Sequence, residues 1–233
     1  MIYDKVVIGA SFFGCGLAVA LGRVKILEPS CVVGADFALT FNGGERWDTK
    51  VVHPLAKEYL AMLREHRAID DQGRAAVAAF SPLLAQWWRK QGLDIELSCS
   101  VVDYRRKRLK LMGVDGPKEY CVSKIHSAVP RRQRRSYLTA LVSGPADLGD
   151  GVYGDFTLKR SLYPGEYYLQ FGYHAFFFWE QARDVFHQKW AQRPEALRDC
   201  RLLLIGTAVD WHNFPNPAVA LDWGLRRKLE DLG

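Results

Sequence analysis

The 233-residue sequence contains no long apolar run of the kind that crosses a membrane. A membrane-spanning helix needs roughly 18 or more consecutive apolar residues, and no stretch approaches that length. The beginning of the chain also differs from a signal peptide, because its apolar run follows Asp4 and Lys5 directly and no small-residue cleavage site comes after it. We therefore expect a cytoplasmic protein without a membrane partner.

The sequence is also poor in paired cysteines. Its five cysteines are scattered singly, and no CxxC pair occurs among them. This excludes a local redox dithiol and a cysteine-based structural zinc site, and we predict no metal site. Isolated cysteines are typical of small apolar residues in a reducing compartment. The five residues are Cys15, Cys31, Cys99, Cys121 and Cys200.

Charge of one sign is not dominant, although the formal net charge of +6 is unevenly distributed. Residues 105–110 read RRKRLK and residues 131–135 read RRQRR. Such clusters can attract nucleic acid. However, no zinc finger, helix-turn-helix or RNA-binding aromatic signature accompanies them. A solvated hairpin face is the favoured interpretation, and we do not expect nucleic acid as a partner.

The pattern of apolar residues predicts an α/β fold. The length suits one large domain or a domain with a modest insert. An apolar strand over residues 2–8, a helix over 12–21 with small residues facing the sheet, and a strand over 24–27 form a βαβ unit. Further helices are predicted over 54–66, 81–91, 174–191 and 217–229, and strands over 93–103, 108–114, 119–129, 136–171 and 201–205.

A glycine motif connects the first strand to the first helix. Residues 9–14 match GxGxxG, except that Ser11 replaces the middle glycine. Gly9 permits a sharp turn, Gly14 allows the helix to lie close to the sheet, and the helix start attracts a diphosphate. Glu28 follows the second strand, 19 residues after Gly9, at the spacing of an acid that binds an adenosine ribose. Its charge disfavours NADP. The alternative is a βαβ unit that binds no nucleotide.

Three segments together resemble a known family. The opening VVIGASFFGCGLAVAL…VKILEPS, the strand-rich residues 92–129 and the ending LLLIGTAVDWHNFPNPAVALDWGLRRKL are similar to FAD-dependent oxidoreductases with the glutathione-reductase-like FAD-binding fold. The segments cover roughly half of the chain and occur in the family's order. The ending, with Gly206, Thr207 and a histidine-containing loop, is nearest the amine-oxidase branch.

The resemblance implies a role for each matching residue. The glycine motif would face the diphosphate, Glu28 with its neighbours would hold the ribose, and the last helix would point its start at the flavin. His212 is a weak candidate for a catalytic base, and a loop histidine bonded to the backbone is an equal alternative. The residues expected to bind FAD are Gly9, Ala10, Ser11, Phe12, Phe13, Gly14, Glu28, Pro29, Ser30, Thr40, Asn42, Val101, Val102, Gly206, Thr207, Asp210, Pro217 and Ala218.

These features lead to a functional hypothesis. Residues 1–130 with 195–233 would form a Rossmann-like FAD-binding domain, and residues 131–194 a small α+β cap on the substrate side. The predicted function is a flavin-dependent oxidoreductase that transfers hydride from a small organic molecule, such as an amine or amino-acid derivative, to FAD. The absence of a second glycine motif argues against a pyridine-nucleotide disulfide reductase. A cofactor-poor accessory subunit and an NAD-dependent dehydrogenase are the alternatives.

Three further interpretations concern the cap and the core. Because the cap is small, a second protomer or a partner subunit would complete the active site. The aromatic residues between Tyr163 and Trp179 are more typical of a core or subunit interface than of a pocket wall. Cys15 follows the glycine motif and is interpreted as core filling rather than as a reactive thiol.

Overall fold

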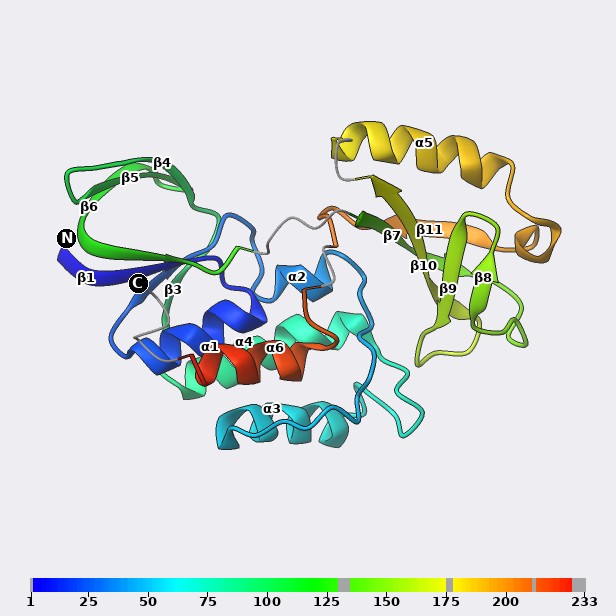
Figure 1. Cartoon of the computed structure of the whole chain (residues 1–233), viewed down its shortest axis with the longest axis horizontal. Coiled ribbons are helices and arrows are strands. Elements are labelled where there is room, and N and C mark those ends of the chain that lie inside the picture. Colours follow the sequence, from blue (N-terminus) through cyan, green and yellow to red (C-terminus); the bar gives the residue numbers. More distant parts are fainter. Residues whose placement is uncertain (1, 130–134, 175–177, 211–212, 228–233) are drawn as a thin grey trace.

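The computed structural model describes residues 2–129, 135–174, 178–210 and 213–227. Two regions follow one another along the long axis of the molecule (Figure 1). One contains a six-stranded sheet with most of the helices, and the other contains a five-stranded sheet with one long helix.

The six-stranded sheet has the strand order β3-β2-β1-β6-β5-β4. Its centre is parallel, because β1 pairs in parallel with both β2 and β6, and β2 with β3. The remaining strands form an antiparallel meander that ends in β6. The bounds are Ile2–Ile8 (β1), Lys25–Leu27 (β2), Asp94–Glu96 (β3), Ser100–Arg105 (β4), Arg108–Gly113 (β5) and Gly116–Ser127 (β6).

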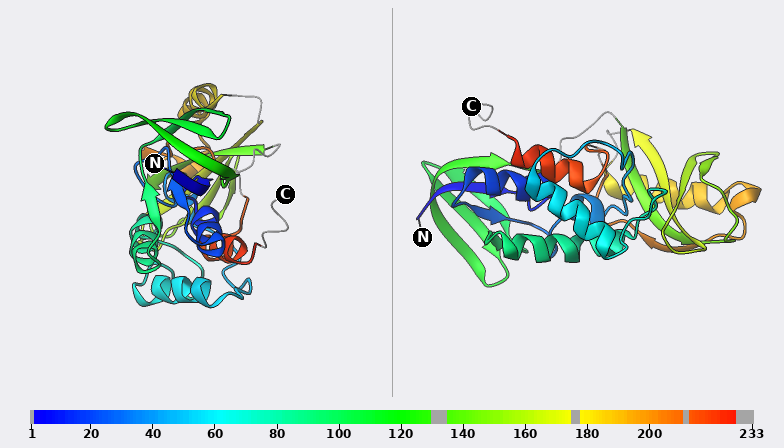
Figure 2. Two further views of the ribbon diagram at one scale, coloured as in Figure 1. Left: turned by 90° about the vertical axis from the view of Figure 1, so that its left-hand side faces the viewer. Right: turned by 90° about the horizontal axis from the view of Figure 1, so that it is seen from below.

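Helices cover one face of the parallel strands. The sheet curves so that the meander folds over their other face (Figures 1 and 2). Alternating side chains of the strands supply both cores. Val7 and Ile26 belong to the core with the helices, whereas Val6 and Leu27 pack with residues of the meander. The helices are α1 (Phe12–Leu21), α2 (Ala35–Ala38), α3 (Pro54–Glu65), α4 (Phe80–Lys90) and α6 (Pro217–Leu225), with a short 3₁₀ turn η1 at Val77–Ala79.

The first and last helices touch through glycines. A Cβ added at Gly16 would lie 2.4 Å from the Leu221 carbonyl oxygen, and one at Gly224 would lie 2.2 Å from the Phe13 carbonyl oxygen. The prediction that the small residues of α1 face the sheet is therefore wrong for Gly16, which lies against α6. Close backbone contact at both glycines holds α6 against α1.

The second region is an antiparallel sheet in the order β11-β7-β10-β9-β8. Helix α5 (Trp179–Ala191) packs against it, with Phe186 in the core beside Phe156 and Phe171. The bounds are Arg135–Ser143 (β7), Gly151–Tyr153 (β8), Phe156–Arg160 (β9), Glu166–His174 (β10) and Arg201–Ile205 (β11), and a 3₁₀ turn η2 covers Glu195–Leu197.

The position of β11 differs from the predicted division of the chain. The sequence placed 195–233 with the nucleotide-binding region, but β11 pairs with β7 at the edge of the second sheet. Only after Ile205 does the chain return to the first region, where it forms α6. An apolar strand pattern shows burial and does not show which sheet the strand joins.

The aromatic residues of β10 lie in the core. Tyr167, Phe171 and Tyr173 are buried within the second region, and Tyr168 is buried against the core of the first. For these four residues the core interpretation is confirmed. Phe176 and Phe177, which the sequence analysis grouped with them, lie outside the described residues.

The basic hairpin between β4 and β5 is solvent-exposed. Arg106 and Lys107 form its turn with positive φ angles, and both are exposed. On its flanks Arg105 pairs with Asp103 at 3.2 Å and Arg108 with Glu119 at 3.2 Å. These pairs support the interpretation of a solvated face; residues 131–134 of the other basic cluster are outside the described part. Within the described ranges, no helix is long and apolar enough to cross a membrane.

Candidate functional site

The turn after β1 requires glycine at two positions. Gly9 has a φ of 103°, which L side chains rarely adopt. A Cβ at Gly14 would lie 2.1 Å from the Gly9 carbonyl oxygen and 2.8 Å from the Ala128 Cβ. Both glycines therefore allow α1 to start directly against the end of the sheet, which is the geometry of a dinucleotide-binding turn.

Ser11 is the N-cap of α1. Its hydroxyl accepts a hydrogen bond from the Gly14 amide at 3.0 Å and donates one to the Ala128 carbonyl at 3.0 Å. A serine at this position thus stabilises the helix start in a way that a glycine could not. The side chain is buried and points back toward β6, so the replacement of the middle glycine is accommodated inside the fold.

Glu28 lies at the end of β2 and faces the glycine turn. Its Oε2 accepts a hydrogen bond from the Ala10 amide at 2.6 Å, and its Oε1 accepts one from the Ser30 amide at 2.8 Å. The side chain is buried, and Pro29 between these residues is exposed. The acid and the turn, separated in sequence, are therefore brought into direct contact.

The segment after Glu28 folds back over the start of α1. The Gly34 amide donates to the Ala10 carbonyl at 2.8 Å. Asp36, in the short helix α2, accepts a hydrogen bond from the Phe12 amide through its Oδ1 at 3.3 Å. Figure 1 shows α2 beside the beginning of α1. Asp36 is not among the residues expected from the sequence to bind FAD, because the spacing after Gly9 points to Glu28 as the acid.

The loop that follows α2 joins the two regions. The amide of Gly206 donates to the Thr139 carbonyl at 2.7 Å, and that of Thr207 donates to the Leu39 carbonyl at 3.0 Å. Thr40 is fully buried, and its carbonyl accepts a hydrogen bond from the Thr139 hydroxyl. The predicted residues Thr40, Gly206 and Thr207 thus share one junction. Asn42 is buried nearby in sequence and accepts from the Gly44 amide at 2.9 Å.

The closing segment, which connects β11 to α6, is held in place just before α6 begins. Asn216 caps this helix by accepting from the Val219 amide at 3.0 Å, and its side chain donates to the Glu45 carbonyl at 3.2 Å. Pro217 and Ala218 are buried at the helix start. Asp210 is buried, and its backbone pairs with that of Tyr137. His212 lies outside the described residues.

Val101 and Val102 occupy the edge strand β4. Both side chains are exposed, and the pairing with β5 shifts in register beside Val101. The strand starts close to Glu28, because the Cys99 amide donates to the Glu28 carbonyl at 3.0 Å. The predicted place of the two valines beside an adenine stays a prediction.

Burial changes the acidity of several groups around the turn. It raises the pKa of Asp36 to about 7, despite hydrogen bonds from the backbone amides of Phe12 and Asp36, and the charges of Glu28 and Asp210 add to the rise. Burial also raises the pKa of the Cys15 thiol and of the Tyr59 phenol, so both stay neutral. The Cys15 side chain is fully buried, which confirms its interpretation as core filling.

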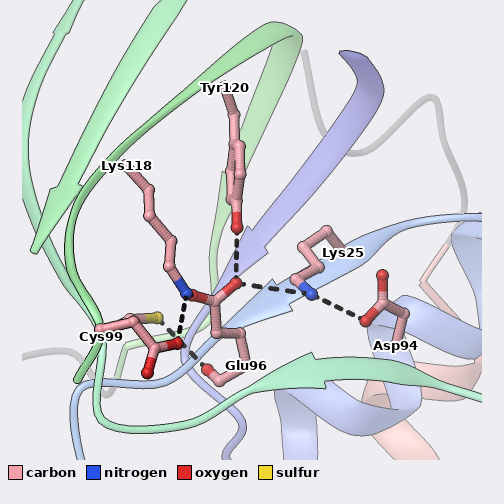
Figure 3. Close-up of polar contacts among 7 residues, drawn as sticks. Lys25, Asp94, Glu96, Cys99, Lys118 and Tyr120 are labelled. Carbon is pink, nitrogen blue, oxygen red and sulfur yellow. Dashed lines mark hydrogen bonds and ion pairs between the residues drawn. The ribbon is translucent and has the colours of Figure 1, made fainter. Parts of the chain in front are cut away.

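A second charged cluster lies where β3 meets the meander. Figure 3 shows Lys118 and Tyr120 reaching from β6 to Glu96, with Lys25 between Glu96 and Asp94. The Glu96 carboxylate is 2.9 Å from the Lys118 Nζ, 2.7 Å from the Tyr120 hydroxyl and 3.5 Å from the Lys25 Nζ. Although burial opposes it, the hydrogen bonds from Tyr120 and Lys118 and the charge of Lys25 lower the pKa of Glu96.

One surface pocket lies away from the glycine turn. Among the described residues, no group of three or more His, Cys, Asp or Glu side chains is placed to hold a metal ion. A surface pocket of about 490 Å³ lies between α3 and α4, lined by residues that include Met62, His66 and Trp87. None of the predicted site residues lines it.

Comparison with known proteins shows a shared fold. No protein-family model and no curated protein matches this sequence. The myxobacterial chondrochloren halogenase CndH, a variant of FAD-dependent halogenases, is 14% identical with a TM-score of 0.59, over 90% of this chain and 62% of its own. A flavoprotein/dehydrogenase from Cytophaga hutchinsonii is 15% identical with a TM-score of 0.52, over 97% of this chain and 76% of its own.

A third structure, the flavin-dependent halogenase CmlS, is 11% identical with a TM-score of 0.53 and is matched over 49% of its length. This chain therefore spans about half to three quarters of the flavoenzymes it resembles. The fold prediction is confirmed: the chain has the Rossmann-like α/β fold of these proteins. The assignment to the amine-oxidase branch stays a prediction.

The residues around the turn fit the adenosine half of FAD, with one departure. Gly9, Gly14 and the start of α1 provide the close approach that a diphosphate needs, and the Glu28 carboxylate stands beside them. The departure is Asp36, an acid hydrogen-bonded to an amide at the helix start.

Proposed function

We propose that this chain binds FAD and forms part of a flavin-dependent oxidoreductase. The observation that carries the proposal is the contact between Glu28 and the Ala10 amide, which fixes an acid at the end of β2 against a glycine turn. This pairing is what an adenosine ribose and its diphosphate require. The fold that holds it is shared with flavoenzymes.

Each part of the site then has a role. Residues 9–14 would hold the diphosphate at the start of α1, where backbone amides and the helix dipole favour an anion. Glu28, beside Ser30, would orient the ribose. The junction of Thr40, Gly206 and Thr207 would lie along the flavin half, with Asn42, Asp210 and the start of α6 at Pro217 and Ala218. Bound FAD supplies the electron acceptor, while the chain binds it and orients the substrate.

The substrate side of the proposal is a small organic molecule that gives hydride to the flavin, such as an amine or amino-acid derivative. It rests on the closing motif that contains Gly206 and Thr207. Two of the similar structures are FAD-dependent or flavin-dependent halogenases, which supports flavin chemistry on this fold. The five-stranded region would cover the flavin as a cap. Because this cap is small, a second protomer or partner subunit would complete the pocket.

The purified protein tests this proposal directly. We expect a yellow protein with an absorbance band near ~450 nm, and mass spectrometry of the heat-released small molecules should identify FAD. Glu28→Gln should bind FAD about tenfold more weakly, because a charge-assisted hydrogen bond to the ribose is lost. Glu195→Gln, whose side chain is 82% exposed in the second region, is the matched control and should bind normally.

A colourless protein that takes up no added FAD would contradict the proposal. A specific observation would then favour a non-catalytic accessory subunit. The amides of Ala10, Phe12 and Gly14 already have acceptors within the chain, namely Glu28, Asp36 and Ser11. Reversible binding of NAD without a bound chromophore would instead identify the NAD-dependent dehydrogenase of the sequence analysis.

A further inference from the structure

An internal carboxylate lies where an external anion would be expected. The start of a helix attracts negative charge through its free amides and its dipole. At the start of α1 the Phe12 amide donates to Asp36 Oδ1 at 3.3 Å. The side chain reaches this point because α2 places it beside the turn, where the Gly34 amide is bonded to the Ala10 carbonyl.

The surroundings of Asp36 are acidic. Glu28 at the end of β2 and Asp210 in the closing segment both act electrostatically on it. In the described part of the chain, neither Asp36 nor Glu28 forms an ion pair with a lysine or arginine. A diphosphate entering this position would add two negative charges beside these acids. Like charges a few ångströms apart repel strongly when they are partly buried.

We propose that Asp36 is an internal substitute for the diphosphate, and that its negative charge limits the affinity of this chain for adenine dinucleotides. The proposal rests on the function proposed above. It goes further because Asp36, a residue outside the glycine motif, would control the affinity for the diphosphate. For the diphosphate to take its place, Asp36 would have to leave the Phe12 amide, and a neutral Asp36 leaves more easily and does not repel the ligand.

This requirement makes binding depend on pH. The groups that act on Asp36, or on which it acts, are Glu28 of the β2 end, Asp210 of the closing segment, Cys15 of α1 and Tyr59 of α3. Cys15 and Tyr59 are neutral because burial raises their pKa. The pKa of Asp36 is raised to about 7, so Asp36 changes charge near neutral pH. Affinity should therefore fall as pH rises through that value.

Isothermal titration with ADP-ribose tests the proposal. This probe carries the adenosine and the diphosphate of FAD without the flavin. Wild-type affinity should fall about tenfold between about pH 6 and pH 8, because one group deprotonates. Asp36→Asn should lose this dependence and bind about tenfold more tightly than wild type at the higher pH. Asp184→Asn removes an equal charge from the exposed side of α5 and should behave as wild type.

Adenosine is the control ligand. It lacks the diphosphate, so its affinity should be unaffected by Asp36→Asn. An equal gain for adenosine, or equal affinity of Asp36→Asn and wild type for ADP-ribose at the higher pH, would overturn the role of Asp36 and leave FAD binding intact. Failure of every protein to bind FAD or ADP-ribose at both pH values would overturn both proposals. Should Asp36→Asn fail to fold, the wild-type pH series decides: pH-independent affinity rejects the proposal.

Discussion

The two acidic clusters at the ends of β2 and β3 are neighbours that are stabilised in opposite ways. The Glu28 amide donates to the Glu96 carbonyl at 2.9 Å, so the two clusters share one edge of the parallel sheet. Glu96 is surrounded by two lysines and a tyrosine hydroxyl (Figure 3). Glu28 and Asp36, by contrast, accept from backbone amides.

This difference appears in the acidity of the two groups. Hydrogen bonds and lysine charges lower the pKa of Glu96, whereas burial raises the pKa of Asp36 to about 7. The cluster around Glu96, which we call the meander cluster, is thus balanced in charge and contributes to folding as a set of ion pairs. In the described part of the chain Glu28 and Asp36 have no lysine or arginine ion-pair partner, and a carboxyl group with a strongly raised pKa, such as Asp36, is more typical of binding sites than of structural ones.

The largest effect expected from this contrast is on pH-dependent stability at Asp36. A raised pKa means that the folded state binds a proton more tightly than the unfolded state, so stability is lost as pH rises through about 7. Asp36→Asn removes the loss. The difference in unfolding free energy between the variant and wild type should grow by about 2 to 3 kcal/mol from about pH 5 to pH 8.

Urea denaturation of both proteins at several pH values provides this measurement, and Asp184→Asn serves as the control. Parallel pH profiles for Asp36→Asn and wild type would show that Asp36 is charged in the fold throughout. The contrast with Glu96 would then disappear.

The next largest effect concerns Glu96 and has the opposite sign. Its lowered pKa contributes stability that is present above the unfolded value and is lost as pH falls through the folded value. Glu96→Gln should lower the unfolding free energy by about 1 to 2 kcal/mol at neutral pH, because two lysines lose a partner. The deficit should shrink as pH falls through the lowered pKa of Glu96 and wild type also becomes protonated. A deficit that stays constant with pH would contradict the role of charge in this cluster.

Most of the framework around these clusters could be predicted from the sequence. β1 and α1 have the predicted bounds, because an apolar run followed by Gly9 and then by a helical pattern has few alternative structures. The contact of Glu28 with the turn also follows from its place after β2. In both cases the signal is local, and the βαβ connection fixes the rest.

Asp36 and β11 show where the sequence is insufficient. Asp36 reaches the Phe12 amide only because the segment after Glu28 folds back over α1, and composition gave no sign of that path. β11 has the expected bounds but joins the second sheet through β7. Both depend on contacts between distant parts of the chain, which apolar periodicity does not encode.

A smaller effect is expected for Glu28 without ligand. Glu28→Gln replaces one carboxylate oxygen by an NH₂ group, which cannot accept the hydrogen bond from the Ser30 or Ala10 amide. The other oxygen remains an acceptor. The unfolding free energy should fall by about 1 kcal/mol, measured by urea denaturation at neutral pH. Saturating FAD should stabilise wild type more than the variant. Equal stabilisation of both would separate Glu28 from ligand binding.

The smallest effect is expected at the rim of the meander cluster. Asp94 pairs with the Lys25 Nζ at 2.8 Å, but its side chain is 55% exposed. Water and salt screen such a pair, so Asp94→Asn should change the unfolding free energy by less than about 0.5 kcal/mol. A loss as large as that of Glu96→Gln in the same denaturation series would mean that the cluster acts as one unit rather than through Glu96.

The decisive measurement is a crystal structure of the chain grown with ADP-ribose near pH 6. We expect the diphosphate at the Phe12 amide, the ribose hydroxyls at Glu28, and the Asp36 side chain displaced from its hydrogen bond at the start of α1. A ligand bound elsewhere, or a turn in which Asp36 still holds the Phe12 amide at full ligand occupancy, would contradict this expectation.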